Sequence, residues 1–235
     1  MLVKEKSILT AALLGYFCIF YFTLQRVLLF VPHQFELSRI DLAIPFDARW
    51  TIVYQSLYLF LPLPWLASSN DQLRRYARGF FIVTLISFAF FLVFPVEGPR
   101  PDIMTSDPMY RLLLAYDRNL NAFPSLHAAL AVYTFLFALR ILPSKFAIAG
   151  SAWIALVLYA TMATKQHYAI DVVAGVIVAI AADFLAWRYT PVDETHASRP
   201  PLVVRSGDNI RADTGGGGGA SGAPQHQVDV RAGGE

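Results

Sequence analysis

Charged side chains are scarce in this sequence. Asp, Glu, Lys and Arg make up 15% of its 235 residues, whereas a soluble domain contains about 25%. Hydrophobic residues make up 56%, and the polar residues concentrate toward the C-terminus. The formal net charge is only +2, and no basic stripe with interleaved aromatic residues is present, which argues against a nucleic-acid partner. The composition therefore predicts a membrane protein.

Cysteine is almost missing as well. The single cysteine, Cys18, lies inside an apolar run, so an intrachain disulfide is excluded. That first run is about 25 residues long and has no small-x-small cleavage site. It therefore predicts a membrane anchor rather than a signal peptide.

Long apolar runs are abundant. A helix needs about 20 apolar residues to cross the hydrocarbon core of a bilayer, and six runs approach this length, although the second, third and fifth are short. The six runs are Ser7–Val31, Trp50–Ala67, Gly79–Phe94, Ser125–Leu142, Phe146–Met162 and Ala169–Tyr189. We expect an all-α, polytopic bundle of six transmembrane helices in residues 1–190. Residues 191–235 include the stretch TGGGGGASGAP and are expected to form a disordered, Gly-rich cytoplasmic tail.

Basic residues predict the orientation of this bundle. They concentrate in one set of short connections, which the positive-inside rule assigns to the cytoplasm. These residues are Lys4, Lys6, Arg74, Arg75, Arg78, Arg140, Lys145 and Arg188. The alternate connections 32–49, 95–124 and 163–168 then face outward, giving cytoplasmic N- and C-termini. We expect a plasma membrane location, the inner membrane in a bacterium, with the outer loops facing the periplasm or a lumen.

Polar residues gather at three outward helix ends. In KQHYAID, His167 and Asp171 are four residues apart and share one face of a helix. A carboxylate in that position can accept a hydrogen bond from one imidazole nitrogen and leave the other free as a nucleophile or base. A solvated helix N-terminus with a favourable acidic residue is the alternative interpretation of this pair.

Two other outward segments supply groups that suit an anion. In FPSLH, Pro124 fits the first turn of a helix, Ser125 offers a hydroxyl group, and His127 can donate a proton to a leaving oxygen. In GPRPD, the planar guanidinium of Arg100 suits bidentate capture of a phosphate. Lys165 offers a second cation next to His167.

Phosphoryl transfer through a phosphohistidine needs this combination of groups. A metal site is the competing interpretation, since His and Asp are also metal ligands, and Glu97 and Asp102 keep it open. The two cations Arg100 and Lys165 favour a phosphate over a divalent metal ion. We expect no metal and no cofactor.

The order and spacing of these motifs resemble the type 2 phosphatidic acid phosphatase superfamily. Its signatures K-x6-R-P, P-S-G-H and S-R-x5-H-x3-D are similar to Arg100-Pro101, PSLH at 124–127 and the His167–Asp171 pair. The resemblance implies that His167 is the nucleophile that becomes phosphorylated, with Asp171 as its orienting partner. It implies further that His127 protonates the leaving alcohol.

The resemblance also implies that Arg100 and Ser125 lie at the phosphate. The sequence departs from the family pattern at four positions, where Val93, Leu126, Ala160 and Thr161 replace the usual lysine, glycine, serine and arginine. Three usual phosphate contacts are therefore missing, and we expect Lys165 to replace one of them. FPSLH and KQHYxxD are similar instead to the branch that contains inositolphosphorylceramide synthases, which transfer a head group between lipids.

We therefore expect an integral-membrane phosphatase that acts on a lipid phosphate or diphosphate through a phosphohistidine. A lipid head-group phosphotransferase is the close alternative, because the two reactions differ only in the acceptor. A non-catalytic protein that binds or transports lipids is the alternative from another class, motivated by the missing phosphate contacts.

Overall fold

The structure is a computed structural model that describes residues 2–102 and 105–188. Met1–Pro191 form one compact unit. The predicted tail at 191–235 lies outside the described residues. Within the described ranges the secondary structure is helical, as predicted, with two isolated β-bridges and no strand.

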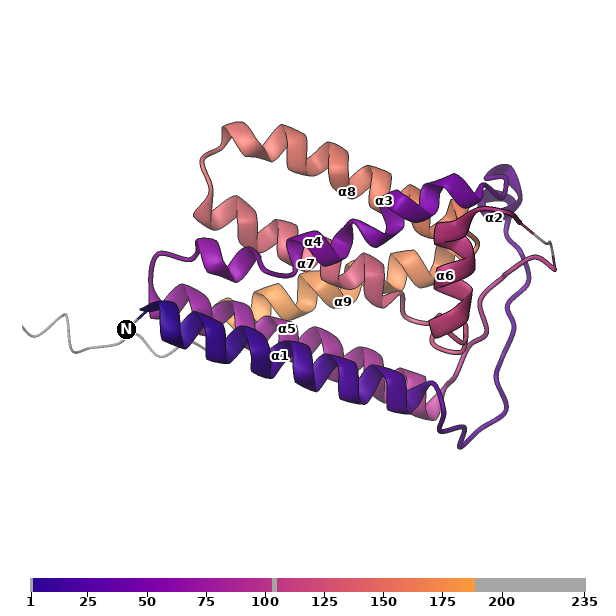
Figure 1. Cartoon of the computed structure of the whole chain (residues 1–235), viewed down its shortest axis with the longest axis horizontal. Coiled ribbons are helices and arrows are strands. Elements are labelled where there is room, and N and C mark those ends of the chain that lie inside the picture. The colour runs from indigo at the N-terminus through magenta and orange to yellow at the C-terminus, as the bar shows by residue number, and fades with distance from the viewer. Residues whose placement is uncertain (1, 103–104, 189–235) are drawn as a thin grey trace, which may run out of the picture. The chain divides into compact units, whose positions relative to one another are not determined.

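Four helices in the described part of the chain are long and apolar enough to cross a membrane. They are α1 (Leu2–Leu24), α5 (Asn70–Val93), α8 (Lys145–Ala163) and α9 (Ala169–Arg188). The shorter apolar helix α7 (Leu126–Ile141) packs against α5, α8 and α9, and α1 packs against α5 (Figure 1). These helices correspond to five of the six predicted runs and support a membrane protein.

The predicted span at 50–67 is broken into short pieces. It contains η1 (Ala48–Trp50), α3 (Thr51–Gln55), α4 (Leu57–Phe60) and η2 (Leu63–Leu66). The stretch LPLP, which begins at Leu61, explains the last break, because a proline has no backbone N–H to continue a helix. Near the first break, the hydroxyl of Ser56 bonds back to the carbonyl of Val53 at 2.6 Å. Residues 50–67 therefore do not form one straight transmembrane helix.

Two helix boundaries also differ from the predicted runs. Helix α1 ends at Leu24 rather than at Val31. Helix α5 begins at Asn70, before the predicted Gly79, because the hydroxyl of Ser69 accepts a hydrogen bond from the backbone N–H of Gln72 at 3.2 Å and caps the helix. Apolar runs miss such ends, since a capped first turn tolerates polar side chains.

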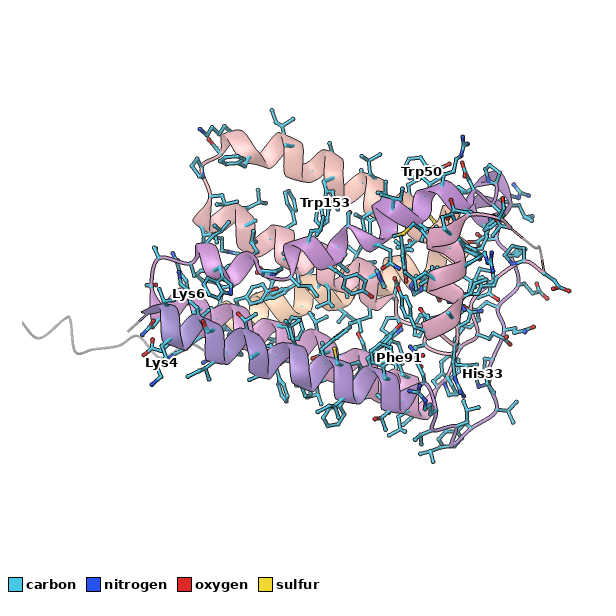
Figure 2. The ribbon with its side chains drawn as sticks, viewed as in Figure 1. Lys4, Lys6, His33, Trp50, Phe91 and Trp153 are labelled. Atoms are coloured by element: carbon cyan, nitrogen blue, oxygen red, sulfur yellow. The ribbon has the colours of Figure 1, made fainter. Side chains whose placement is uncertain are left out.

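The two ends of the helical unit carry different groups. Figure 2 shows Lys4 and Lys6 at one end, and His33 and Trp50 at the other. The short helices α2 (Arg39–Ala43) and α6 (Pro108–Tyr116) lie at this second end (Figure 1). The helix ends that carry the two sequence-predicted histidines lie there as well.

An ion pair holds α7 to α9 near the first end. The guanidinium of Arg140 donates to both carboxylate oxygens of Asp183, at 2.5 and 2.6 Å. Arg75 from α5 and Arg140 both lie over the ring of Trp187, with 4.6 and 4.8 Å from the guanidinium carbon to the ring centroid. Asp183, a charged residue in an apolar helix, is thus paired inside the protein rather than facing lipid.

Candidate active site

His167 lies in the tight turn between α8 and α9. The backbone N–H groups of Gln166 and His167 both donate to the carbonyl of Thr161, and Lys165 adopts a left-handed conformation with φ 54°. The imidazole of His167 is buried, and its Nδ1 lies 2.9 Å from the carbonyl oxygen of Ala122. A carbonyl only accepts, so Nδ1 carries the proton. In the neutral ring the lone pair is then on Nε2, the nitrogen available to attack.

The segment that holds His167 is itself fixed by pairing between loops at the same end of the helices. Val96 forms isolated β-bridges with His33 and with Asn121. The N–H of Ala122 donates to the carbonyl of Val96 at 3.0 Å. The carbonyl of Ala122 is therefore presented to His167 by a fixed backbone rather than by a mobile loop.

Asp171 lies behind this contact and does not form a short hydrogen bond with His167. Its Oδ2 is 3.7 Å from Nδ1 of His167, which is ion-pair range but too long for a hydrogen bond. The same oxygen accepts the backbone N–H of Tyr168 at 2.8 Å and caps the start of α9. Asp171 is fully buried. In the neutral state the Ala122 carbonyl therefore orients the ring, and Asp171 supplies a nearby negative charge.

His127 lies in the first turn of α7 and is surrounded by aromatic rings. Its ring stacks on Tyr54 from α3, with centroids 3.8 Å apart, and Tyr58 from α4 meets its face edge-on at 5.6 Å. The hydroxyl of Tyr54 lies 2.9 Å from Nδ1 of His127. Within the described residues, the buried Nε2 of His127 has no hydrogen-bond partner. The rings of His127 and His167 are 6.3 Å apart between centroids.

The sequence did not single out Tyr54 as a site residue. A tyrosine near the end of an apolar run is typical of the membrane interface, but the side chain of Tyr54 is only 1% exposed. A tyrosine hydroxyl both donates and accepts. It can therefore hold Nδ1 of His127 whether that nitrogen is protonated or not. Only the three-dimensional arrangement of α3 and α7 reveals this contact.

Arg100 reaches the same place from the loop after α5. Its guanidinium donates to the side-chain oxygen of Gln166 through Nε, at 2.9 Å, and through Nη2. It also donates to the backbone carbonyl of Asp117 at 2.8 Å and pairs with the carboxylate of Asp117 at 3.5 Å. The hydroxyl of Tyr21 in α1 donates to the same carboxylate at 3.3 Å. Arg100 is thus fully partnered inside the protein.

These residues line one small cavity. The described lining consists of Tyr21, Tyr54, Arg100, Asp117, Asn119, Asn121, Ala122, Leu126, His127, Gln166 and His167. Its volume is about 10 Å³, the space of roughly one water molecule. A phosphate therefore enters only if Arg100 exchanges its internal partners for phosphate oxygens. The cavity brings together three sequence-predicted residues, Arg100, His127 and His167.

The other three predicted residues are not among the described residues that line the cavity. The hydroxyl of Ser125 accepts the N–H of Ala128 at 3.2 Å and caps α7. Asp171 caps α9, as above. The amine of Lys165 donates to the backbone carbonyls of Asp41 and Ile44, at 2.7 and 2.5 Å, and burial lowers the pKa of Lys165. In this conformation Lys165 fastens α2 to the turn that carries His167.

The side chain of Asp41 also links α2 to the start of α9. One of its carboxylate oxygens accepts the N–H of Ala169 at 2.7 Å, and the other accepts the N–H of Ser38 at 2.8 Å. Asp41 therefore caps α9 from a different segment of the chain. This role was not predicted, because Asp41 caps a helix that begins more than a hundred residues later in the chain.

A larger cavity of about 250 Å³ lies between α7 and α8, around Phe135 and Trp153. None of its described lining residues is ionisable, so it offers no group for phosphoryl transfer. No cluster of three metal-ligand side chains occurs among residues 2–102 and 105–188. Glu97, one of the carboxylates that kept a metal site open, accepts a hydrogen bond from Gln34 at 2.8 Å.

The fold and the cavity define a helical membrane protein with two histidines and an arginine at one end of its apolar helices. The sequence model of the PAP2 superfamily matches residues 22–185, and the chain belongs to this superfamily. No curated protein and no solved structure matches the chain. The superfamily generally comprises phosphatases and phosphotransferases. Membership therefore supports an enzyme of that kind, with phosphatase-type activity.

Proposed function

We propose that the protein is an integral-membrane phosphatase that acts on a lipid phosphate or diphosphate through a phosphohistidine intermediate. One observation carries the proposal. The Ala122 carbonyl occupies Nδ1 of His167 and leaves Nε2 as the nucleophile, while the partnerless Nε2 of His127 in the described chain lies in the same cavity. Both histidines line one small cavity, with ring centroids 6.3 Å apart, and this supports the assignment of one as nucleophile and the other as proton donor.

The reaction proceeds in two steps. In the first, Nε2 of His167 forms a bond to phosphorus as the bond from phosphorus to the leaving oxygen breaks. His127, protonated on both nitrogens, gives its Nε2 proton to that oxygen and keeps the Nδ1 proton, which it donates to Tyr54. In the second step water attacks phosphorus, gives a proton to Nε2 of His127, and the bond to His167 breaks. Free phosphate leaves and the enzyme is restored.

Arg100 binds the phosphate in this scheme. Its guanidinium already donates to the side-chain oxygen of Gln166 at the cavity. That oxygen occupies a position in which a phosphate oxygen could accept the same hydrogen bond. We expect a phosphate oxygen to replace that acceptor when the cavity opens. Asp171 supports the positive charge that develops on His167, because an opposite charge within about 4–6 Å favours the charged form.

We place the site at the outer membrane face. The basic connections lie at the other end of the helices, and the positive-inside rule assigns them to the cytoplasm. In this arrangement the substrate is a lipid in the outer leaflet of the plasma membrane, or of the inner membrane in a bacterium, with its phosphate facing the periplasm or a lumen. The apolar helices next to the cavity then contact its hydrocarbon chains.

The test is turnover by His167→Ala and His167→Gln in purified protein, against a panel of lipid phosphates with and without alcohol acceptors. Wild type is expected to release inorganic phosphate and, with labelled substrate, to retain label on His167 after rapid quenching. Both variants should lose turnover and label while keeping the thermal melting temperature of wild type. Full activity in either variant would contradict the mechanism.

The acceptor panel separates the alternatives. Release of phosphate identifies the phosphatase. Formation of a new phospholipid only when an alcohol is present identifies a head-group transferase, as in the inositolphosphorylceramide synthase-like branch that FPSLH and KQHYxxD resemble. Tight lipid binding with neither product nor label identifies a non-catalytic protein.

A further inference from the structure

Asn121 is a polar residue of the cavity that has no part in the proposed mechanism. It forms a β-bridge with Val96 and directly precedes Ala122, whose carbonyl holds His167. The side chain is 7% exposed and lines the same cavity as Arg100 and His167. Its backbone is therefore as firmly fixed as that of the nucleophile's partner.

The side-chain nitrogen of Asn121 is buried and has no hydrogen-bond partner within residues 2–102 and 105–188. Buried polar atoms nearly always have partners in folded proteins, because an unpaired donor loses its hydrogen bonds to water. Among the described cavity-lining residues, the atom shares this state only with Nε2 of His127. Both atoms belong to residues that line one cavity, which indicates that a ligand there completes their hydrogen bonds.

The neighbouring donors of the cavity are already engaged. The amide nitrogen of Asn119 donates to the carbonyl of Gly98 at 2.9 Å, and that of Gln166 donates to the carbonyl of Thr164 at 3.1 Å. The hydroxyl of Tyr21 donates to Asp117. Asn121 thus keeps a free N–H₂ group of the kind that binds an anionic oxygen.

The motif departures show why such a donor is needed. Val93, Ala160 and Thr161 stand where related sequences carry phosphate contacts, and Lys165 is bonded to backbone carbonyls. Arg100 is the one Lys or Arg in the described lining, and Asp117 offsets its charge. A second contact must therefore come from a neutral donor.

We propose that the side-chain amide of Asn121 donates a hydrogen bond to a non-bridging oxygen of the substrate phosphoryl group, next to Arg100. This inference rests on the proposed function and adds a substrate-binding residue to it. The amide replaces one of the missing phosphate contacts. It binds the phosphoryl oxygen without adding charge to the cavity.

The test uses Asn121→Ala, which removes the donor, and Asn121→Asp, which keeps its size but places a negative charge beside the phosphate. The probes are 4-nitrophenyl phosphate as substrate and inorganic phosphate as competitive inhibitor of the full-length protein. Removal of one hydrogen bond to a charged group weakens binding by about 10-fold to 100-fold. For Asn121→Ala we expect KM and the inhibition constant to rise by that factor with kcat nearly unchanged, and for Asn121→Asp a larger rise.

Asn70→Ala is the matched control. Asn70 begins α5 near the opposite end of the helices, and its side-chain oxygen is likewise buried without a partner in the described residues. This variant should keep wild-type KM and inhibition. If the wild-type protein is active and Asn121→Ala or Asn121→Asp keeps its KM and inhibition constant, the inference about Asn121 is wrong and the proposed function still stands. A wild type that neither hydrolyses the substrate nor binds inorganic phosphate overturns the proposed function as well.

Discussion

The two histidines differ in how their rings are held. His167 is held by a backbone carbonyl, and His127 is held by a tyrosine hydroxyl and by two aromatic rings. A carbonyl accepts only, so it fixes one tautomer, which suits a nucleophile. A hydroxyl accepts and donates, so it accommodates two protonation states, which suits a group that gives up and regains a proton.

This difference predicts how His127 variants respond to the leaving group. His127→Ala should lower kcat for an alkyl phosphate by about 100-fold to 10,000-fold, the usual contribution of a general acid. The loss should be much smaller for 4-nitrophenyl phosphate, because nitrophenolate leaves without a proton. Parallel kcat measurements on the two substrates check this. Equal losses on both would show that His127 binds or positions substrate rather than donating a proton.

At this scale the sequence predicted three residues that meet in the cavity, but not the residues that hold them in place. The spacing of Arg100, His127 and His167 was sufficient to predict that they meet, and the cavity contains all three. Tyr54 and Asn121 were not predicted as site residues, because each is a single polar residue that only the packing of the chain brings to the cavity. Lys165 was expected at the phosphate from proximity in sequence alone, and its amine bonds to carbonyls of α2.

The positions of individual helices were predicted correctly where the helix coincides with an uninterrupted apolar run. Helices α8 and α9 match their apolar runs to within one residue at each end. Residues 50–67 are equally apolar, but the helix is broken at Ser56, between Tyr54 and Tyr58, and again at the prolines that follow, and both tyrosines lie against His127. The proline signal was present in the sequence. Its consequence for the site depended on packing, which the sequence alone does not reveal.

Close contact between two elements gives a prediction for Gly175 in α9. A Cβ atom built there lies 2.4 Å from the backbone carbonyl oxygen of Ser125, the residue that caps α7. Gly175→Ala gains about 1 kcal/mol in helix propensity but forces the helices apart at a cost of about 1–3 kcal/mol. Because a backbone atom cannot turn away, we expect a net loss of melting temperature in detergent, together with reduced turnover.

Gly15→Ala in α1 is the control for that substitution. Nothing lies within 4 Å of a Cβ built at Gly15, so this variant gains helix propensity without a clash. Its melting temperature should equal or exceed that of wild type. A Gly175→Ala protein that melts no lower than Gly15→Ala would show that α7 and α9 can separate at little cost.

At the scale of the whole molecule, the family match covers residues 22–185 and thus contains every residue of the proposed mechanism. The helical class was predicted from composition and is confirmed. The number of membrane crossings remains a prediction, because the described chain has four helices of sufficient length, one shorter apolar helix and the broken segment. Hydropathy measures the apolarity of a segment, but not whether its backbone is continuous.

The orientation can be tested with single cysteines. After Cys18→Ala, Glu36→Cys places a thiol in an exposed outer loop and Lys4→Cys places one at the opposite end. A membrane-impermeant maleimide should label Glu36→Cys in intact cells, and Lys4→Cys only after permeabilisation. The reverse labelling pattern would show the opposite orientation, with the site facing the cytoplasm.

The backbone bond between the two catalytic helices has a consequence for how substrate enters. The N–H of Ser125 donates to the carbonyl of Asp171 at 3.0 Å, so the starts of α7 and α9 are joined next to both histidines. We therefore expect the two histidines to move together. In the proposed mechanism a phosphate is then admitted by side-chain exchange at Arg100 and by movement of the loops that line the cavity. We expect the rate of that opening, rather than any approach of the two histidines, to limit substrate capture.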